Sequence, residues 1–388
     1  MNMREIYFDN SATTKVFPEV ADIVMKTMTE DYGNPSSKHQ KGFDAEKYFR
    51  TAREQVAETL KVKPREIVFT SGGTESNNTA IFGTALARHR LGKHIITSQV
   101  EHAAMYRPLE MLEKEFGFEV TFLPVDSKGH ISLEDLRKAV RKDTILVSIM
   151  QVNNEMGAIE PIEEIGKLVK SINPETYVHT DAIQSYGKLT IRPKKQYIDM
   201  LSVSGHKIHG PKGVGFLYVD ENVHIKPLVY GGGQQEDRRS GTHNVPGIAG
   251  LGLAAQMIYT DHEKKMEKLY GIKDYFIDEV EKLPGVIVNS EKGEASAPQI
   301  VSVSFEGVRA EVLLHALEDK GIYVSSGSAC SSNHPGISGT LKAIGVRPDL
   351  LDSTIRFSFG MYNEKEEVDL CMEALYALLP VLRKYTRH

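Results

Sequence analysis

Between about residues 65 and 220, short apolar runs alternate with longer amphipathic segments, and this alternation constrains the fold more than any other feature of the chain. Most of the intervening segments, such as 77–91 and 162–172, have apolar residues at helical spacing. This pattern predicts an α/β fold in which helices wrap a mostly parallel, seven-stranded sheet. The expected strands are 67–69, 94–97, 120–122, 145–149, 177–179, 201–203 and 214–218.

The C-terminal third of the chain has a different pattern, in which residues 248–283 are predicted to form one long helix. With 388 residues, the chain is long enough for two domains with well-buried cores. We expect a large domain over 15–258 and a smaller α+β domain made of 1–14 and 259–388. The later strands are expected at 300–305 and 354–357, and further helices near 309–320 and 364–385.

Polar clusters follow several of the predicted strands. In open α/β sheets, ligands bind beyond the carboxyl ends of the strands, so these clusters mark the expected site. Strands 201–203 and 214–218 leave no room for a helix between them, and one cluster lies in that short connection. The clusters are 70–74, 151–155, 180–181 and 204–207.

Lys207 and Asp181 belong to two of these clusters, and together they suit an aldehyde cofactor. A lysine amine forms a Schiff base with an aldehyde, and an acid keeps a pyridinium nitrogen protonated so that the ring draws electrons from the substrate. Taken singly, such a lysine is more often solvated, and such an aspartate is more often a helix N-cap. Gln184 follows at a distance that suits contact with a ring hydroxyl. The combination of Lys207, Asp181 and Gln184 predicts pyridoxal phosphate as the cofactor.

The segment 71–77 is predicted to hold the phosphate group of that cofactor. It follows a strand and begins a helix, and its two glycines free backbone amides at the positive end of the helix dipole. Glycine turns that only join a strand to a helix are commoner, so this motif alone is weak. Ser204 and His206, beside Lys207, offer further donors to a phosphate.

His102 and Arg356 are candidates that each have a structural alternative. A histidine at the start of a helix is more often a surface or capping residue, but here it suits stacking on the cofactor ring and proton exchange near neutral pH. Arg356 lies within an otherwise apolar strand and needs an anionic partner. A substrate carboxylate and a structural ion pair explain it equally well.

Cys330 lies in a loop of serine and glycine residues, 325–332, which cannot build a packed core. A thiol in such a loop is expected to reach into a site and to swing out again. The other cysteine, Cys371, lies in an apolar helical segment and is expected in the core. Because two cysteines cannot form a disulfide framework, we expect a reducing compartment.

The sequence indicates neither a membrane nor a nucleic-acid partner. The net charge is −5 and both signs are interspersed along the chain. The N-terminal residues show no signal-peptide core, and no apolar stretch reaches the roughly 18 residues that a spanning helix needs. We expect a cytoplasmic protein.

Taken together, the motifs resemble those of the NifS/IscS-type cysteine desulfurases, a class-V branch of the fold-type I pyridoxal phosphate enzymes. They occur in the order of that family across nearly the whole chain. The matching stretches are 7–14, 33–37, 70–77, 101–102, 152–157, 181–184, 204–207, 239–242, 327–330 and 355–358.

The resemblance implies roles for individual residues. Lys207 corresponds to the Schiff-base lysine, Cys330 to the nucleophile that accepts sulfur, and His102 to the acid/base that stacks on the ring. Arg356 corresponds to the clamp on the substrate carboxylate, with Asn153 as a further substrate contact. Thr242 corresponds to a residue that reaches the phosphate of the other subunit, which implies a homodimer with shared active sites. The implied cofactor-binding residues are Gly73, Thr74, Asn153, Asp181, Gln184, Ser204, His206, Lys207 and Thr242.

The implied reaction converts L-cysteine to L-alanine and leaves the sulfur on Cys330 as a persulfide. A sulfur-acceptor protein, either an iron–sulfur scaffold or a thiolation protein, is expected to receive it. A selenocysteine or cysteine sulfinate substrate is one alternative, because those leaving groups depart without a thiol. A sulfur-relay or binding protein, in which Lys207 is a structural remnant, is the other. Residues 331–336 differ from the usual continuation of the family's loop.

Overall fold

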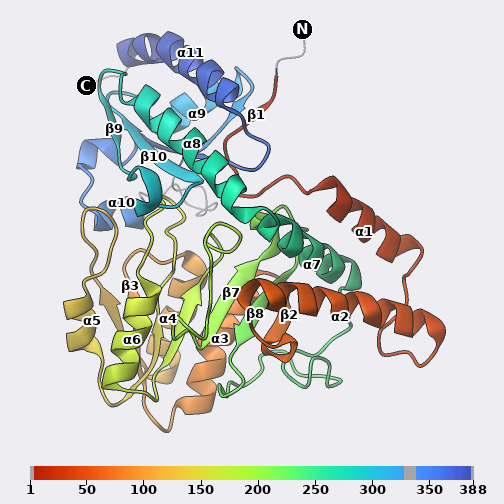
Figure 1. Cartoon of the computed structure of the whole chain (residues 1–388). Coiled ribbons are helices and arrows are strands. Elements are labelled where there is room, and N and C mark those ends of the chain that lie inside the picture. The colour runs from red at the N-terminus through yellow and green to blue at the C-terminus, as the bar shows by residue number, and fades with distance from the viewer. Residues whose placement is uncertain (1–3, 327–337, 386–388) are drawn as a thin grey trace.

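The computed structural model describes residues 4–326 and 338–385, and its larger sheet has seven strands (Figure 1). Their order is β2-β8-β7-β6-β5-β3-β4, with β8 antiparallel to both of its neighbours and all other pairs parallel. The predicted mostly parallel, seven-stranded sheet is therefore confirmed. The strands are β2 (Ile67–Thr70), β3 (His94–Ser98), β4 (Glu119–Leu123), β5 (Thr144–Ser148), β6 (Tyr177–Asp181), β7 (Met200–Ser204) and β8 (Gly215–Val219).

Burial on both faces explains why these strands appear as apolar runs in the sequence. Every residue of β3 and of β5 to β8 is buried, whereas the edge strand β4 is largely accessible. Adjacent residues face opposite sides, so that Leu201 joins one hydrophobic cluster and Met200 the other. Helices α3 and α4 cover the Met200 face, and α1, α2, α5, α6 and α7 cover the Leu201 face. These helices are α1 (Pro18–Thr29), α2 (Gln40–Leu60), α3 (Gly73–Arg88), α4 (Ala103–Phe116), α5 (Leu133–Ala139), α6 (Ile162–Ile172) and α7 (Val245–Tyr259).

A second, smaller part lies above the carboxyl edge of the large sheet in Figure 1 and has its own hydrophobic core. Its sheet has the order β12-β13-β10-β9, and beside it β1 pairs in parallel with β11. Phe8, directly after β1, is fully buried in this core. The N-terminal segment therefore packs with the C-terminal part of the chain. The elements are β1 (Ile6–Tyr7), α8 (His262–Val280), β9 (Val286–Val288), β10 (Ile300–Phe305), α9 (Ala310–Glu318), β11 (Ile322–Tyr323), β12 (Ser325–Ser326), α10 (Gly339–Ala343), β13 (Thr354–Ser358) and α11 (Lys365–Leu382).

The prediction of one long helix over 248–283 is wrong, because two helices occupy this stretch. α7 ends at Tyr259 and α8 begins at His262. Between them, Asp261 has a left-handed backbone with φ of 49°, which a continuous helix cannot accommodate. The apolar spacing continues across this break without a glycine or proline, so periodicity alone could not reveal it.

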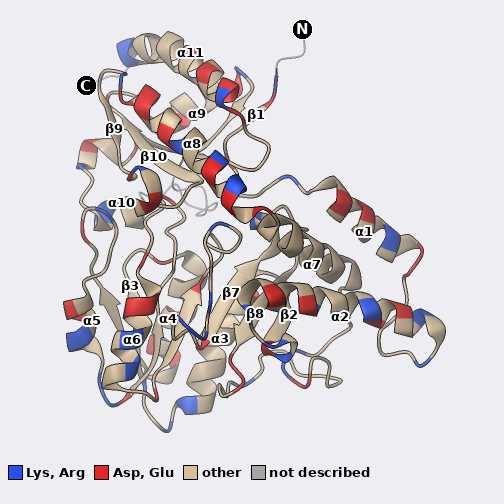
Figure 2. Ribbon diagram, in the orientation of Figure 1, with Lys and Arg blue, Asp and Glu red and all other residues tan. Residues whose placement is uncertain are grey.

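Charged residues of both signs are interspersed along the outer helices, for example α2 and α8 (Figure 2). Within the described part of the chain, no helix combines the length and the apolar character needed to cross a membrane.

Candidate active site

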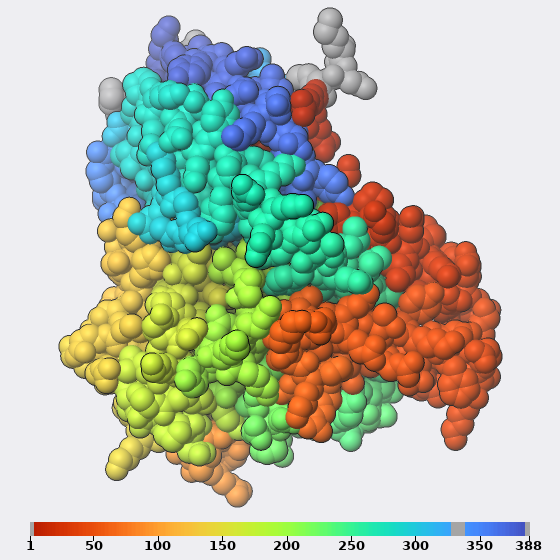
Figure 3. All heavy atoms as spheres, in the orientation of Figure 1, coloured from red at the N-terminus to blue at the C-terminus, as the bar shows by residue number. Residues whose placement is uncertain are grey.

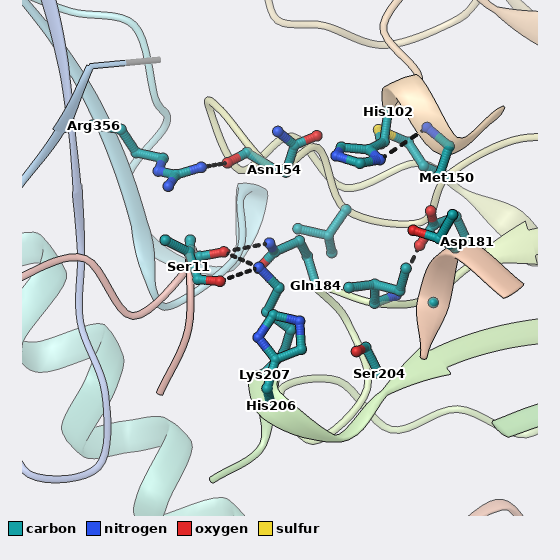
Figure 4. Close-up of a pocket in the computed structure, with 16 residues that line it drawn as sticks. Ser11, His102, Met150, Asn154, Asp181, Gln184, Ser204, His206, Lys207 and Arg356 are labelled. Carbon is teal, nitrogen blue, oxygen red and sulfur yellow. Dashed lines mark hydrogen bonds between the residues drawn. The ribbon is translucent and has the colours of Figure 1, made fainter. Parts of the chain in front are cut away.

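A cavity of about 260 Å³ lies at the carboxyl edge of the large sheet, where the smaller part covers it (Figure 4). Its walls come from the ends of several strands, from the N-terminal segment and from β13. This is the position predicted from the polar clusters. The lining residues are Ser11, Ala12, Gly73, Thr74, His102, Ala104, Met150, Val152, Asn154, Asp181, Ile183, Gln184, Ser204, His206, Lys207 and Arg356.

Lys207 lies at the end of a 3-10 turn, Gly205–Lys207, that directly follows β7. No helix intervenes before β8, so the lysine remains at the sheet edge. Its amine donates hydrogen bonds to the backbone carbonyls of Ser11 and Ala12, the latter at 2.7 Å. The N-terminal segment therefore orients the amine within the cavity (Figure 4).

Gly72 and Gly73 form a cradle at the beginning of α3. Gly72 has φ of +148°, which a side chain would disfavour. A Cβ at Gly73 would lie 2.1 Å from Cδ1 of Ile183, so a side chain at this position would require Ile183 to move. Glu75 accepts a hydrogen bond from the amide of Ser71 at 2.8 Å and fixes the turn. Backbone N–H groups at a helix N-terminus in such a turn attract an anion.

Asp181 is buried at the end of β6 and is held in one orientation. Nδ2 of Asn77 donates to its carboxylate at 2.7 Å, and the amide of Ile183 donates at 2.9 Å. Burial raises the pKa of Asp181, while these hydrogen bonds and the positive charges of His102 and Lys207 oppose the rise. A cationic ring nitrogen against the carboxylate would favour the ionised form in the same way.

Two residues of the predicted set face the same cavity with defined partners. Nε2 of Gln184 donates to the carbonyl of Ser11 at 3.1 Å, so that Gln184 and Lys207 share this acceptor (Figure 4). Nδ1 of His206 lies 3.2 Å from Oγ1 of Thr13. Burial, with a smaller contribution from the charge of Lys207, lowers the pKa of His206 to about 4. His206 is therefore neutral near pH 7 and can donate from one ring nitrogen.

His102 caps the N-terminus of α4 and also lines the cavity. Its Nδ1 accepts a hydrogen bond from the amide of Ala104 at 3.1 Å. In the neutral ring the proton then resides on Nε2. His102 therefore has the capping role that the sequence offered as the alternative. It also lies in the cavity where the acid/base was expected.

Arg356 forms the structural ion pair that the sequence offered as one of two explanations, and the substrate contact stays a prediction. Its Nη2 forms an ion pair with Oδ1 of Asp9 at 3.0 Å, and its Nη1 donates to the carbonyl of Asn154 at 2.8 Å. The guanidinium also lines the cavity, and its Nε is buried without a hydrogen-bond partner among the described residues. The guanidinium of Arg356 is therefore only partly engaged in hydrogen bonds and retains N–H groups for a further anion.

Two predicted residues lie outside the cavity lining of this chain, and a third is not among the described residues. The side chain of Asn153 is buried, where it donates to the carbonyl of Val100 at 3.1 Å and accepts from the amide of Glu155 at 2.9 Å, while its neighbour Asn154 lines the cavity. Thr242 is exposed. Cys330 lies outside the described residues. Their roles stay predictions.

The residue-by-residue prediction missed Ser11, Ala12 and Asp9 as members or neighbours of the site. They belong to 7–14, a stretch that carried the family resemblance but has no periodic pattern of its own. Their proximity to Lys207 and Arg356 depends on contacts between residues far apart in the sequence, such as the bridge between Asp9 and Ser358.

Comparisons with known proteins agree with this geometry. Residues 6–371 match the sequence model of the aminotransferase class-V family. The cysteine desulfurase IscS of Dictyoglomus turgidum is 44% identical over 381 residues, which are 98% of this chain and 96% of that protein. A solved NifS-like protein superposes with a TM-score of 0.92 at 39% identity, covering 98% of this chain and 100% of that chain. SspA, solved in complex with cysteine, superposes with a TM-score of 0.80 at 36% identity, covering 92% and 100%.

Proposed function

Because the chain belongs to the aminotransferase class-V family and, within it, to the cysteine desulfurases, it is a pyridoxal phosphate enzyme, and we propose that Cys330 receives the sulfur of L-cysteine in its active site. The observation that carries this proposal is that Lys207 and Asp181 line one cavity together with the glycine cradle of α3. That a related structure was solved with cysteine supports the choice of substrate.

The residues of the cavity fit the cofactor. The glycine turn at 72–73 and the backbone amides at the start of α3 suit the phosphate, with Thr74, Ser204 and His206 as further donors. Asp181 suits the ring nitrogen, and Lys207 suits the aldehyde. When bound, pyridoxal phosphate withdraws electrons from the α-carbon of the substrate.

Arg356 is positioned to hold the substrate carboxylate. Its unused N–H groups match a carboxylate geometrically, and its location on the smaller part closes the cavity opposite the sheet. This contact fixes the substrate, so that its α-proton and its sulfur occupy defined positions relative to Lys207 and His102.

Lys207 and His102 are the groups that move protons in this proposal. The amine of Lys207 is oriented by the carbonyls of Ser11 and Ala12 and takes the α-proton. Nε2 of His102 gives and takes a proton at the thiol groups, since Nδ1 is engaged with the amide of Ala104. Steps of this kind contribute roughly 10²–10⁴-fold each.

The sulfur transfer balances without an added oxidant. The thiolate of Cys330 attacks the sulfur of the bound substrate, the sulfur–sulfur bond forms, and the bond between that sulfur and Cβ breaks. The electron pair of the broken bond takes up a proton, so the products are L-alanine and the Cys330 persulfide. We propose that a sulfur-acceptor protein then takes the persulfide sulfur for iron–sulfur cluster assembly or another thiolation pathway, in the cytoplasm.

We also propose a homodimer in which Thr242 reaches the cofactor phosphate of the other subunit. Thr242 is exposed and lies outside its own cavity, on a segment that is fixed to the large sheet. Both polar atoms of the Gln235 side chain bond to the backbone of Phe69, at 2.7 and 2.9 Å. In addition, α1, the start of α2 and the segment between them extend from the body (Figure 3). They expose Met25, Met28, Tyr32 and Phe43, which suits burial against a second copy.

An absorption spectrum and a persulfide assay test the function. We expect a visible band from lysine-bound cofactor, a change in that band on adding L-cysteine, release of L-alanine, and extra sulfur on Cys330 by mass spectrometry. Cys330→Ser should retain the band and lose the persulfide, whereas the control Cys371→Ala should retain both. Sulfide release from L-cysteine at the normal rate by Cys330→Ser would refute the role of Cys330, and activity of that variant on selenocysteine or cysteine sulfinate would favour one of those substrates.

A protein without the band that cannot be loaded with pyridoxal phosphate would refute the cofactor and favour a sulfur-relay role.

A further inference from the structure

Lys188 is a buried lysine that the proposed mechanism does not use. It follows β6 by a few residues, only 6% of its surface is exposed, and it does not line the cavity. Its Nζ donates a hydrogen bond to the backbone carbonyl of Lys207 at 3.1 Å. The buried amine thus lies directly behind the turn that carries the active-site lysine.

The surroundings of Lys188 offer no compensating negative charge. Among the described residues, the titratable groups that act on it or feel its charge are Lys207, His209 and His262, and Lys265 acts on the same two histidines. Glu263 also acts on His262, but within the described part of the chain the only charge that acts on Lys188 itself is that of Lys207. Burying an ammonium group without a carboxylate is unfavourable for folding, so a purely structural role would be better filled by an apolar side chain.

We propose that Lys188 is a positioning residue for Lys207, which holds the carbonyl of Lys207 and places a second positive charge behind its amine. Like charges disfavour each other, so the charge of Lys188 favours loss of the proton from the amine of Lys207. The carboxylates of Asp9 and Asp181 act on that amine in the opposite direction. A deprotonated amine is the form that reacts with an aldehyde and accepts a proton from a substrate. The inference rests on the proposed function for the role of Lys207.

The electrostatics of Lys188 limit the pH range of this effect. Burial, followed by repulsion from Lys207, lowers the pKa of Lys188 to about 8. Lys188 therefore carries its charge at neutral pH and loses it in moderately alkaline solution. The influence on Lys207 is expected below about pH 8 and should fade above it.

Two variants separate the charge from the hydrogen bond. Lys188→Met removes both, whereas Lys188→Gln removes the charge and keeps a donor. In the loaded enzyme, we expect the pH titration of the lysine-bound absorption band to move to higher pH in both variants, by about one unit, which is a tenfold change in proton affinity.

Lys273 offers a matched control in the smaller part of the molecule. It is also buried, its pKa is also lowered to about 8, and its Nζ bonds to the carbonyl of Gly293 and to Ser296. Lys273→Met should lower the melting temperature and leave the titration of the band unchanged. The Gln variant keeps the test available if Lys188→Met does not fold.

An unmoved titration in both Lys188 variants would overturn the proposal and leave Lys188 a structural residue. A second measurement does not need the cofactor: the pH dependence of acylation of Lys207 in the cofactor-free protein, read by mass spectrometry. We expect its midpoint to rise in the Lys188 variants, and no rise would contradict the inference. Absence of the lysine-bound band in the unmodified protein would count against the proposed function alone, because the acylation experiment would still report on Lys188.

Discussion

Oδ1 of Asp9 lies 3.0 Å from Nη2 of Arg356, so the guanidinium that faces the cavity already has a counter-charge before any substrate arrives. Burial raises the pKa of Asp9, and the charge of Arg356 opposes this rise. The pair therefore keeps a buried arginine compatible with folding while it leaves other N–H groups for a carboxylate. In the proposed function, the substrate carboxylate and Asp9 compete for the same positive charge.

Replacing Arg356 should damage substrate binding more than cofactor binding. A hydrogen bond to a charged group is worth about 1.5–3 kcal/mol, so kcat/KM for L-cysteine in Arg356→Gln should fall by roughly 10–100-fold. The absorption band of the cofactor should be unaffected. The matched variant Asp9→Asn removes the competing charge, and its KM should fall. Equal losses in both variants would mean that the pair is only structural.

Asp181→Asn tests the carboxylate at the end of β6. The shape is retained and the charge is lost, so the ring nitrogen is no longer held protonated. We expect cofactor loading to persist and kcat to fall by roughly 100-fold or more, since a loss of this size corresponds to about 2.7 kcal/mol of transition-state stabilisation. Asp181→Glu, which restores the charge at a different position, should regain part of the loss. Unchanged kcat in Asp181→Asn would refute the assigned role.

Glu101 should make stability depend on pH. It is buried beside the cavity, it accepts hydrogen bonds from Met150 and Ser98, and burial raises its pKa to about 8. A raised folded-state pKa stabilises the fold fully below the ordinary value of 4.5, and this contribution is lost as the pH rises towards 8. Glu101→Gln has a neutral side chain in both the folded and the unfolded state. The melting temperature of Glu101→Gln minus that of the unmodified protein should therefore be several degrees larger at pH 8 than at pH 4.5.

Glu160, whose pKa is also raised to about 8, contributes to the same pH dependence in both proteins. The difference between Glu101→Gln and the unmodified protein therefore reports Glu101 together with its electrostatic coupling to Asp181 and Glu160. A melting-temperature difference that does not change with pH would contradict the prediction.

Mixing two variants tests the shared active site. Thr242→Val should weaken cofactor binding, because a phosphate contact is lost, and Lys207→Ala should abolish the lysine-bound band. If Thr242 acts on the other subunit, mixed dimers contain sites that have both residues intact. Only sites with an intact Lys207 show the lysine-bound band, and this band reports their affinity for the cofactor. That affinity should recover after the two variants are mixed and have exchanged subunits. No recovery would show that Thr242 acts within its own chain or not at all.

The large sheet could be predicted because its signal is local. Strands such as β5 are buried on both faces and appear as continuous apolar runs, and the ends of these strands must meet at one edge. The positions of Lys207 and Asp181 follow from that rule. The short strands β1, β9, β11 and β12 have two or three residues each and carry no periodic signal.

The remainder of the site depends on contacts that the sequence does not encode locally. No spacing rule relates Asp9 to Arg356. None distinguishes Asn153, whose side-chain amide bonds to Val100 and to its own turn, from Asn154 beside it. The hydrogen bond from Lys188 to Lys207 is equally invisible, because a lysine near a strand end is expected to be solvated. Such features arise only when separate segments of the backbone are brought together.

The pairing of β1 with β11 has a consequence for the biosynthesis of the enzyme. At 5–20 residues per second, a ribosome needs on the order of 15–60 s to add the roughly 300 residues that separate these strands. The large sheet has all of its strands once β8 is made, well before β11, but Ile6 and Phe8 still have no core to enter at that point. Arg356 is synthesised later still, near the end of the chain. A nascent chain can therefore carry Lys207 and Asp181 without a closed cavity, and the enzyme becomes competent only when its two ends meet.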